Sequence, residues 1–223
     1  MEKDRIKALT APFAAFDMDG TLLDSNGAFV DVSDAYLRQR GAVLDDGFIE
    51  RAKTMNFTQY CGALRERANS AESAEETMTE ITERIRSFYA SEAQLKPGAK
   101  AYLEKLKRRG VRMCVASATE EPLIRVVLER FGLEGYFEFI VTVTQVGADK
   151  SQPDIFLEAA RRFGESELSR VTLYDDAFEA LQSASNAGLR TVGLFDPVCA
   201  NTEEAARQLC DAYAESFEEL LQY

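Results

Sequence analysis

Residues 13–21 have the sequence FAAFDMDGT, in which a short apolar run ends on two acids, Asp17 and Asp19. A run that is apolar at successive positions is typical of a parallel strand buried on both faces. Because the acids stand two residues apart at the end of an extended strand, both side chains can face the same crevice. Gly20 permits a tight turn directly after them, and Thr21 can hydrogen-bond that turn. The stretch predicts a strand that delivers two carboxylates to one edge of a sheet.

Apolar runs and amphipathic stretches alternate along the rest of the chain. Further strands are expected at residues 111–116, 139–143, 171–174 and 191–195, and helices at 99–109, 121–131, 153–163 and 177–187. This alternation with short loops predicts an α/β fold with a doubly wound, Rossmann-like parallel sheet. The acidic stretch 203–219 is expected to be a surface helix.

Residues 25–92 interrupt that alternation, because they show no strand pattern. Helical patterns are expected at residues 29–40, 46–53, 58–67 and 73–90. The segment therefore predicts an all-helical cap domain inserted at 25–92. The α/β core domain is then formed by residues 1–24 and 93–223.

The composition excludes several classes of function. The 223 residues include 26 Lys+Arg and 38 Asp+Glu, for a net charge of −12, and no histidine. Catalytic triads and zinc sites that use histidine are therefore excluded. The acidic balance argues against binding to nucleic acid or to anionic lipid.

Localisation is predicted from three further features. No apolar stretch approaches the roughly 18–20 residues of a membrane span, and the first residues do not resemble a signal peptide. The 4 cysteines, at 61, 114, 199 and 210, match no zinc-binding spacing and are expected to be reduced. We therefore expect a cytoplasmic protein without membrane partners.

Polar side chains follow four of the five expected strands, at the ends or a few residues beyond them. The second strand leads into Ser117, the third is followed by Asp149 and Lys150, and the fourth leads into Asp175 and Asp176. In open α/β sheets the active crevice lies beyond these carboxyl ends. A cluster of carboxylates without His or Cys suits Mg²⁺. Ser117 and Lys150 would bind phosphate oxygens, and one Asp can serve as a nucleophile.

Four segments together resemble the motifs of the haloacid dehalogenase-like (HAD) superfamily. They are DMDGTLLDS (17–25), VASAT (115–119), DKSQPDIF (149–156) and YDDAFEALQSASNAG (174–188). Their order and spacing also match. The chain is most similar to the β-phosphoglucomutase-like phosphatases, whose helical C1-type cap is inserted just after the first motif.

The resemblance implies a role for each matching residue. Asp17 would be the nucleophile and Asp19 the general acid and base. The phosphoryl group would be held by Ser117, the backbone N–H of Ala118 and Lys150. The Mg²⁺ ligands would be Asp17, the backbone carbonyl of Asp19, Asp175 and Asp176. Asp175 stands where the subgroup usually has Glu, which leaves open whether it reaches the metal directly or through water.

The function implied is a Mg²⁺-dependent phosphatase that hydrolyses a small phosphorylated metabolite through an aspartyl phosphate. The second acid, Asp19, favours phosphoryl transfer over dehalogenation. A sugar-phosphate mutase is an alternative, but those enzymes typically use a histidine just after the first motif, where this chain has Ser25, Asn26 and Gly27. A second alternative is a non-catalytic protein that binds a phosphorylated ligand. We expect a monomer or a weak dimer.

Two features of the cap segment are weighed separately. Residues 51–56 resemble the substrate-specificity loop of the subgroup, so Lys53 would contact the anionic or polyol end of the substrate, unless it is simply an exposed lysine. Cys61 and Arg67 have the Cys-x5-Arg spacing of cysteine-dependent phosphatases. Those enzymes need a loop of N–H groups around the phosphate, whereas the residues between Cys61 and Arg67 have a helical pattern.

Overall fold

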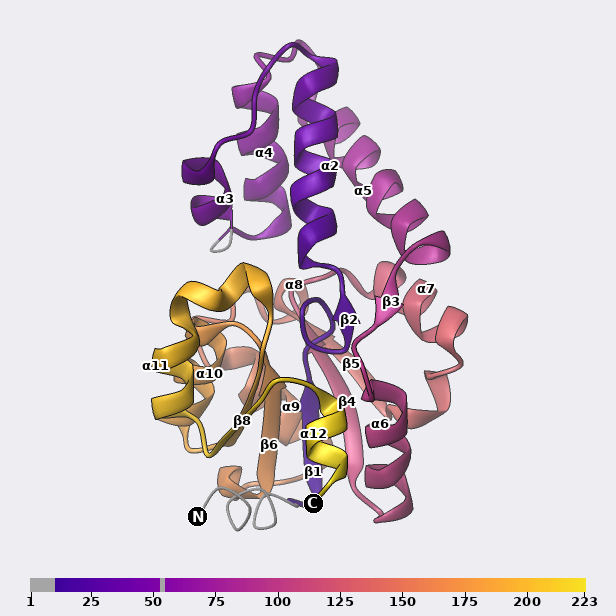
Figure 1. The fold of residues 1–223 in the computed structure, drawn as a ribbon, viewed down its shortest axis with the longest axis vertical. Helices are drawn as coiled ribbons and strands as arrows, with labels where there is room; N and C mark the ends of the chain where they lie inside the picture. The colour runs from indigo at the N-terminus through magenta and orange to yellow at the C-terminus, as the bar shows by residue number, and fades with distance from the viewer. Residues whose placement is uncertain (1–10, 53–54) are drawn as a thin grey trace. The chain divides into compact units, whose positions relative to one another are not determined.

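The computed structural model describes residues 11–52 and 55–223, and its chain forms two compact units (Figure 1). One unit runs to Asp24 and resumes from Gln94 to Tyr223; the other is Ser25–Ala93.

A six-stranded sheet with the order β5-β4-β1-β6-β7-β8 forms the centre of the first unit. Every neighbouring pair in it is parallel. The strands are β1 (Phe13–Phe16), β4 (Arg112–Ser117), β5 (Phe139–Thr142), β6 (Val171–Asp175), β7 (Arg190–Leu194) and β8 (Ala212–Ala214). Since β1 lies between β4 and β6, the strand that precedes Asp17 is central. The predicted fold class, a parallel α/β sheet with a helical insertion, is confirmed.

Alternate residues of the strands pack against helices on opposite faces of the sheet. Ala15 and Leu173 belong to a buried cluster that includes side chains of α9 (Asp154–Phe163) and α10 (Phe178–Ala187). On the other face, Phe16 stacks on Tyr174 with ring centroids 4.4 Å apart and lies 6.4 Å from Phe217. The helices on that face include α6 (Ala99–Arg108) and α12 (Phe217–Leu221), which contact each other. Both faces are therefore covered, as the continuous apolar runs predict.

The remaining elements of this unit connect the strands. They are α7 (Glu121–Phe131), η1 (Glu134–Tyr136), α8 (Val143–Val146), η2 (Leu168–Arg170), η3 (Pro197–Thr202) and α11 (Glu203–Leu209). A two-residue strand on each side of the helical insertion, β2 (Leu23–Asp24) and β3 (Gln94–Leu95), forms a short antiparallel pair. Among the described residues, none of the helices combines the length and the apolarity that crossing a bilayer requires.

The prediction of one surface helix over residues 203–219 is wrong. The helix α11 ends at Leu209, and β8 follows at Ala212–Ala214, where all three residues are buried against β7. A three-residue strand is too short to show a period. The acids on either side, Asp211 and Glu215, hid it in the sequence.

The second unit consists of α2 (Asn26–Gln39), α3 (Asp46–Ala52), α4 (Phe57–Arg67) and α5 (Ala74–Ser91). Both α4 and α5 begin with a capping box. In α5, the Ser73 hydroxyl accepts from the Glu76 N–H while the Glu76 carboxylate accepts from the Ser73 N–H. One face of each of these helices is buried, with Leu37, Leu64 and Ile81 fully inaccessible to solvent.

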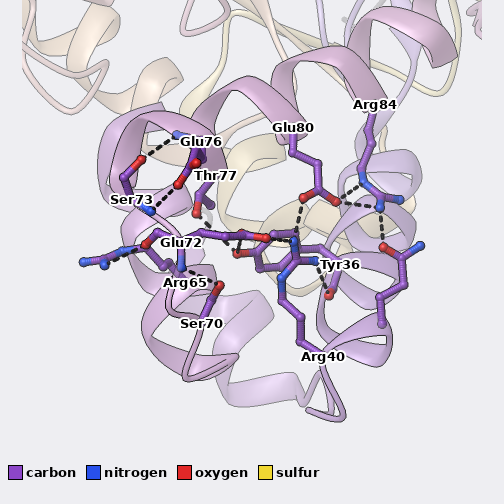
Figure 2. Close-up of polar contacts among 11 residues, drawn as sticks. Tyr36, Arg40, Arg65, Ser70, Glu72, Ser73, Glu76, Thr77, Glu80 and Arg84 are labelled. Atoms are coloured by element: carbon purple, nitrogen blue, oxygen red, sulfur yellow. Dashed lines mark hydrogen bonds and ion pairs between the residues drawn. The ribbon is translucent and has the colours of Figure 1, made fainter.

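A partly buried polar network joins α2 to α5 and to the turn before it (Figure 2). The Arg40 guanidinium donates to Glu72 Oε1 and to Glu80 Oε2, both at 2.6 Å. The Tyr36 hydroxyl donates to Glu72 Oε2 at 3.2 Å and lies 3.3 Å from the Thr77 hydroxyl. One half-buried cation thus compensates two carboxylates from different segments.

Replacing Arg40 should therefore destabilise the helical unit. The Arg40→Met variant leaves Glu72 and Glu80 without their shared partner, which we expect to cost roughly 1–3 kcal/mol. The control is Arg38→Met, because Arg38 is 75% exposed and pairs with Asp34 on the same helix. That change should cost less than about 0.5 kcal/mol. Urea unfolding compares the variants, and equal costs would contradict this account of the network.

Gly98 and Gly110, which flank α6, provide a second test variant and its control. Both have positive φ, +80° and +76°, so alanine at either position should cost about 1 kcal/mol. A Cβ at Gly98 would lie 2.5 Å from Glu218 N and 2.9 Å from Phe217 C, whereas at Gly110 it would meet nothing within 4 Å. We expect Gly98→Ala to cost at least about 2 kcal/mol more than Gly110→Ala in urea unfolding, because the backbone of α12 must move.

Candidate functional site

The loop after β1 is closed on itself by backbone hydrogen bonds. The Asp17 N–H donates to Tyr174 O at 2.9 Å, which extends the pairing of β1 with β6 by one residue. The Leu23 N–H donates to Met18 O at 2.8 Å, and the Gly20 N–H donates to Leu23 O at 2.9 Å. Gly20 has φ +76°, the left-handed conformation that glycine adopts without strain. The loop thereby fixes Asp17 at the carboxyl edge of the sheet.

Three carboxylates meet there, from Asp17, Asp175 and Asp176, with one oxygen of each within 4.8 Å of the others. All three residues are buried, Asp175 completely. The Lys150 ammonium lies between two of them, 2.6 Å from Asp17 Oδ1 and 2.8 Å from Asp175 Oδ2. The sequence predicted all four residues for the site, and the structure brings them into one cluster.

The charges in this cluster do not balance. Burial, followed by the charge of Asp17, raises the pKa of Asp175 to about 6 against the opposing effect of Lys150. Burial, with Asp175, Asp17 and Asp196 adding to it, holds the pKa of Asp176 well above its usual value. The two carboxylates beside Lys150 raise the pKa of its ammonium despite burial. One lysine faces three acids, so a divalent cation would relieve the excess of negative charge, and this oxygen-only donor set suits Mg²⁺.

The other predicted residues lie on neighbouring loops. The Thr119 hydroxyl donates to Asp19 Oδ2 at 2.7 Å, so Asp19 is tied to the loop that follows β4. Ser117, at the end of β4, is 1% exposed, and its Oγ accepts from the Thr119 N–H at 3.2 Å. Ala118 lies between them and is exposed. Lys53 lies outside the described residues.

Sequence reasoning missed the residues that orient Asp176. The Thr21 hydroxyl donates to Asp176 Oδ1 at 2.9 Å, whereas we expected it to bond the turn on which it lies. The Cys199 thiol donates to Asp176 Oδ2 at 3.4 Å. Asp196 follows β7, where the strand-end rule that identified the other acids would also have found it. The ammonium of Lys96 lies 2.7 Å from Asp196 Oδ2, and Lys96 carries no comparable sequence signal.

The helix expected between Cys61 and Arg67 is present, and it argues against a cysteine-dependent phosphatase site as the sequence did. Cys61 and Arg67 both lie on α4, so no loop of N–H groups surrounds the sulfur. Burial raises the pKa of the Cys61 thiol to about 12, so it is not a thiolate near neutral pH.

Comparison with known proteins gives consistent findings. The family model for haloacid dehalogenase-like hydrolases matches residues 13–188. A phosphorylated carbohydrates phosphatase of Thermotoga maritima is 23% identical over 177 residues, which cover 79% of this chain and 82% of that protein.

Two solved structures share the fold. The crystal structure of CbbY from Rhodobacter sphaeroides in complex with phosphate has a TM-score of 0.81 at 24% identity, covering 94% of this chain and 96% of that one. β-Phosphoglucomutase from Clostridium difficile has a TM-score of 0.76 at 20% identity, covering 94% and 93%. These shares include the helical insertion as well as the sheet.

The raised pKa of Asp176 predicts a pH-dependent stability in the absence of metal. A carboxyl whose pKa is raised by folding contributes stability that is complete below its unfolded pKa and is lost as the pH rises through the folded value. In EDTA at pH 8, Asp176→Asn should therefore be more stable than the wild type, by roughly 1–3 kcal/mol. The difference should shrink towards pH 4.

Thermal or urea unfolding across that pH range tests this prediction. Asp31→Asn, at an exposed position on α2, is the control and should show no such difference. A less stable Asp176→Asn at pH 8 in EDTA would contradict the electrostatic account of the site.

Proposed function

The chain belongs to the haloacid dehalogenase-like hydrolases, and on that premise we propose that it is a Mg²⁺-dependent phosphatase of small phosphorylated sugars or polyols. The observation that carries this proposal is the buried cluster of Asp17, Asp175 and Asp176 with Lys150 bridging two of them. The name of the Thermotoga relative, which acts on phosphorylated carbohydrates, supports the substrate class.

The metal would be held by Asp17 and Asp176, with Asp175 and the backbone carbonyl of Asp19 as its further protein ligands. Bound there, Mg²⁺ supplies positive charge against the phosphoryl oxygens. Lys150 already contacts Asp175 at 2.8 Å, so that ion pair competes with direct coordination by Asp175.

Asp17 is the proposed nucleophile. Its carboxylate attacks phosphorus, the ester P–O bond breaks, and the departing alkoxide takes a proton from Asp19. Asp19 then accepts a proton from water as that water attacks the phosphorus of the aspartyl phosphate. The new acyl phosphate bond breaks, which releases inorganic phosphate and restores the Asp17 carboxylate.

Two groups orient these acids. Lys150 holds Asp17 Oδ1 at 2.6 Å, which restricts rotation of the nucleophile. The hydroxyl of Thr119 holds Asp19 Oδ2 at 2.7 Å, close to the end of β4. Such positioning matters because displacing a reacting oxygen by about 1 Å greatly lowers the rate of the reaction.

The phosphoryl group would be bound by Lys150, Ser117 and the N–H of Ala118. An ammonium group has three donors, and Lys150 directs two of them at Asp17 and Asp175. The third donor is available for a phosphoryl oxygen. Ser117 lies at the carboxyl end of β4, the neighbour of β1 in the sheet.

We predict that Asp17→Asn abolishes phosphatase activity without unfolding the protein. An amide cannot act as the nucleophile, so hydrolysis of an aryl phosphate in Mg²⁺ should fall at least about a thousandfold. EDTA should remove the wild-type activity, and Mg²⁺ should restore it. Asp31→Asn, an exposed acid on α2, should keep the wild-type rate.

The products formed from a panel of sugar and polyol phosphates then distinguish the possible activities. Release of inorganic phosphate supports hydrolysis, whereas a positional isomer of the sugar phosphate would favour a mutase. Appreciable activity in Asp17→Asn would contradict the covalent mechanism. Binding of Mg²⁺ and phosphate without turnover of any substrate would favour a binding protein.

A further inference from the structure

Asp196, in the loop after β7, forms a buried ion pair with Lys96 outside the acid cluster. Asp196 is 2% exposed, and its Oδ2 lies 2.7 Å from the Lys96 ammonium. Lys96 also donates to the carbonyl of Phe195 at 3.2 Å. The two residues are 100 positions apart in the chain. A buried pair of this kind leaves an uncompensated charge if either partner is removed.

Asp196 determines the shape of the turn that follows it. Its Oδ1 accepts from the Val198 N–H at 2.9 Å, and its carbonyl accepts from the Cys199 N–H at 3.0 Å. These bonds begin the short helix η3. The Thr202 hydroxyl, which donates to the Cys199 carbonyl at 2.9 Å, closes the turn from the other side. The backbone of Cys199 is therefore fixed on both sides.

Cys199 in turn contacts Asp176. Its thiol donates to Asp176 Oδ2 at 3.4 Å, while the Thr21 hydroxyl donates to Asp176 Oδ1 at 2.9 Å. The two oxygens of this carboxylate are thus held by donors from two different loops. Rotation of the carboxylate would break both bonds.

Lys96 also connects this turn to the loop that carries Asp17. Its backbone N–H donates to Leu22 O at 2.9 Å, directly beside the pairing of β2 with β3. Its side chain reaches Asp196. A single residue therefore bonds the segment after Asp17 and the turn that presents Cys199.

We infer that Lys96 and Asp196 form a positioning pair that holds Asp176 in the orientation in which it binds the metal. This inference rests on the proposed function, because it concerns the affinity of the same site for Mg²⁺. Neither residue is assigned a contact with substrate. The pair acts through the turn at η3 and through Cys199.

Mg²⁺ binding, measured by titration calorimetry, tests the inference directly. We expect Lys96→Met to weaken Mg²⁺ affinity by about tenfold, while Lys96→Arg stays within about threefold of the wild type because it keeps the charge. Lys100→Met is the control, since among the described residues Lys100 donates to the Phe131 carbonyl at the surface, and the Mg²⁺ affinity of this variant should be unchanged. In steady-state assays, Lys96→Met should raise the Mg²⁺ concentration needed for half-maximal rate more than it lowers the rate at saturating Mg²⁺.

A milder pair of variants guards against loss of the fold. Cys199→Ala removes the thiol that donates to Asp176 Oδ2, and Cys199→Ser replaces that thiol by a hydroxyl. We expect the alanine variant to bind Mg²⁺ severalfold more weakly and the serine variant to recover most of that loss. Thermal unfolding in EDTA establishes that each variant is folded before titration.

The outcomes separate this inference from the proposed function. If the wild type binds Mg²⁺ and Asp176→Asn does not, the metal site stands. Wild-type Mg²⁺ affinity in both Lys96→Met and Cys199→Ala would then overturn the positioning role alone. A folded wild type that binds no Mg²⁺ would overturn the proposed function and this inference together.

Discussion

The ammonium group of Lys150 lies between the carboxylates of Asp17 and Asp175, and the edge of the sheet depends on that contact. Without it, three buried acids would repel one another at the point where the strands end. Even with Lys150, the cluster carries more negative than positive charge. Favourable contacts elsewhere in the fold must therefore offset the remaining repulsion between the acids. The layer of side chains before the acids is closely packed. Phe16 stacks on Tyr174 directly before the acids, and the hydroxyl of Tyr174 lies 2.9 Å from that of Tyr102.

The central features of the site could be predicted from the sequence because a parallel sheet ends its strands along one edge. Asp17, Asp175 and Asp176 follow apolar runs directly, Lys150 follows one a few residues on, and in the structure the four meet. The helical insertion was recognisable for a related reason. Its amphipathic period is long and regular, and capping residues such as Ser73 begin its helices.

The features that the sequence did not predict depend on contacts between distant segments. Lys96 and Asp196 are 100 residues apart, and no local pattern links a lysine after a helical insertion to an acid after a late strand. Nothing in the sequence around Cys199 distinguishes it from the other cysteines. Only the turn at η3 brings its thiol to Asp176. The short strand β8 was not predicted for a different, local reason. Its three residues are too few to show the alternating pattern of a strand.

The central position of β1 also has a consequence for the order in which the chain folds during synthesis. The strand emerges from the ribosome before its neighbours β4 and β6, which begin only at Arg112 and Val171. Until β4 has been translated, β1 therefore has neither of its sheet neighbours to pair with, and β6 follows later still. The helical unit, Ser25–Ala93, is contiguous and has its own buried contacts, so it can form during that interval. Nascent β1, an apolar strand without partners at that stage, is thus a segment that association with a chaperone would protect.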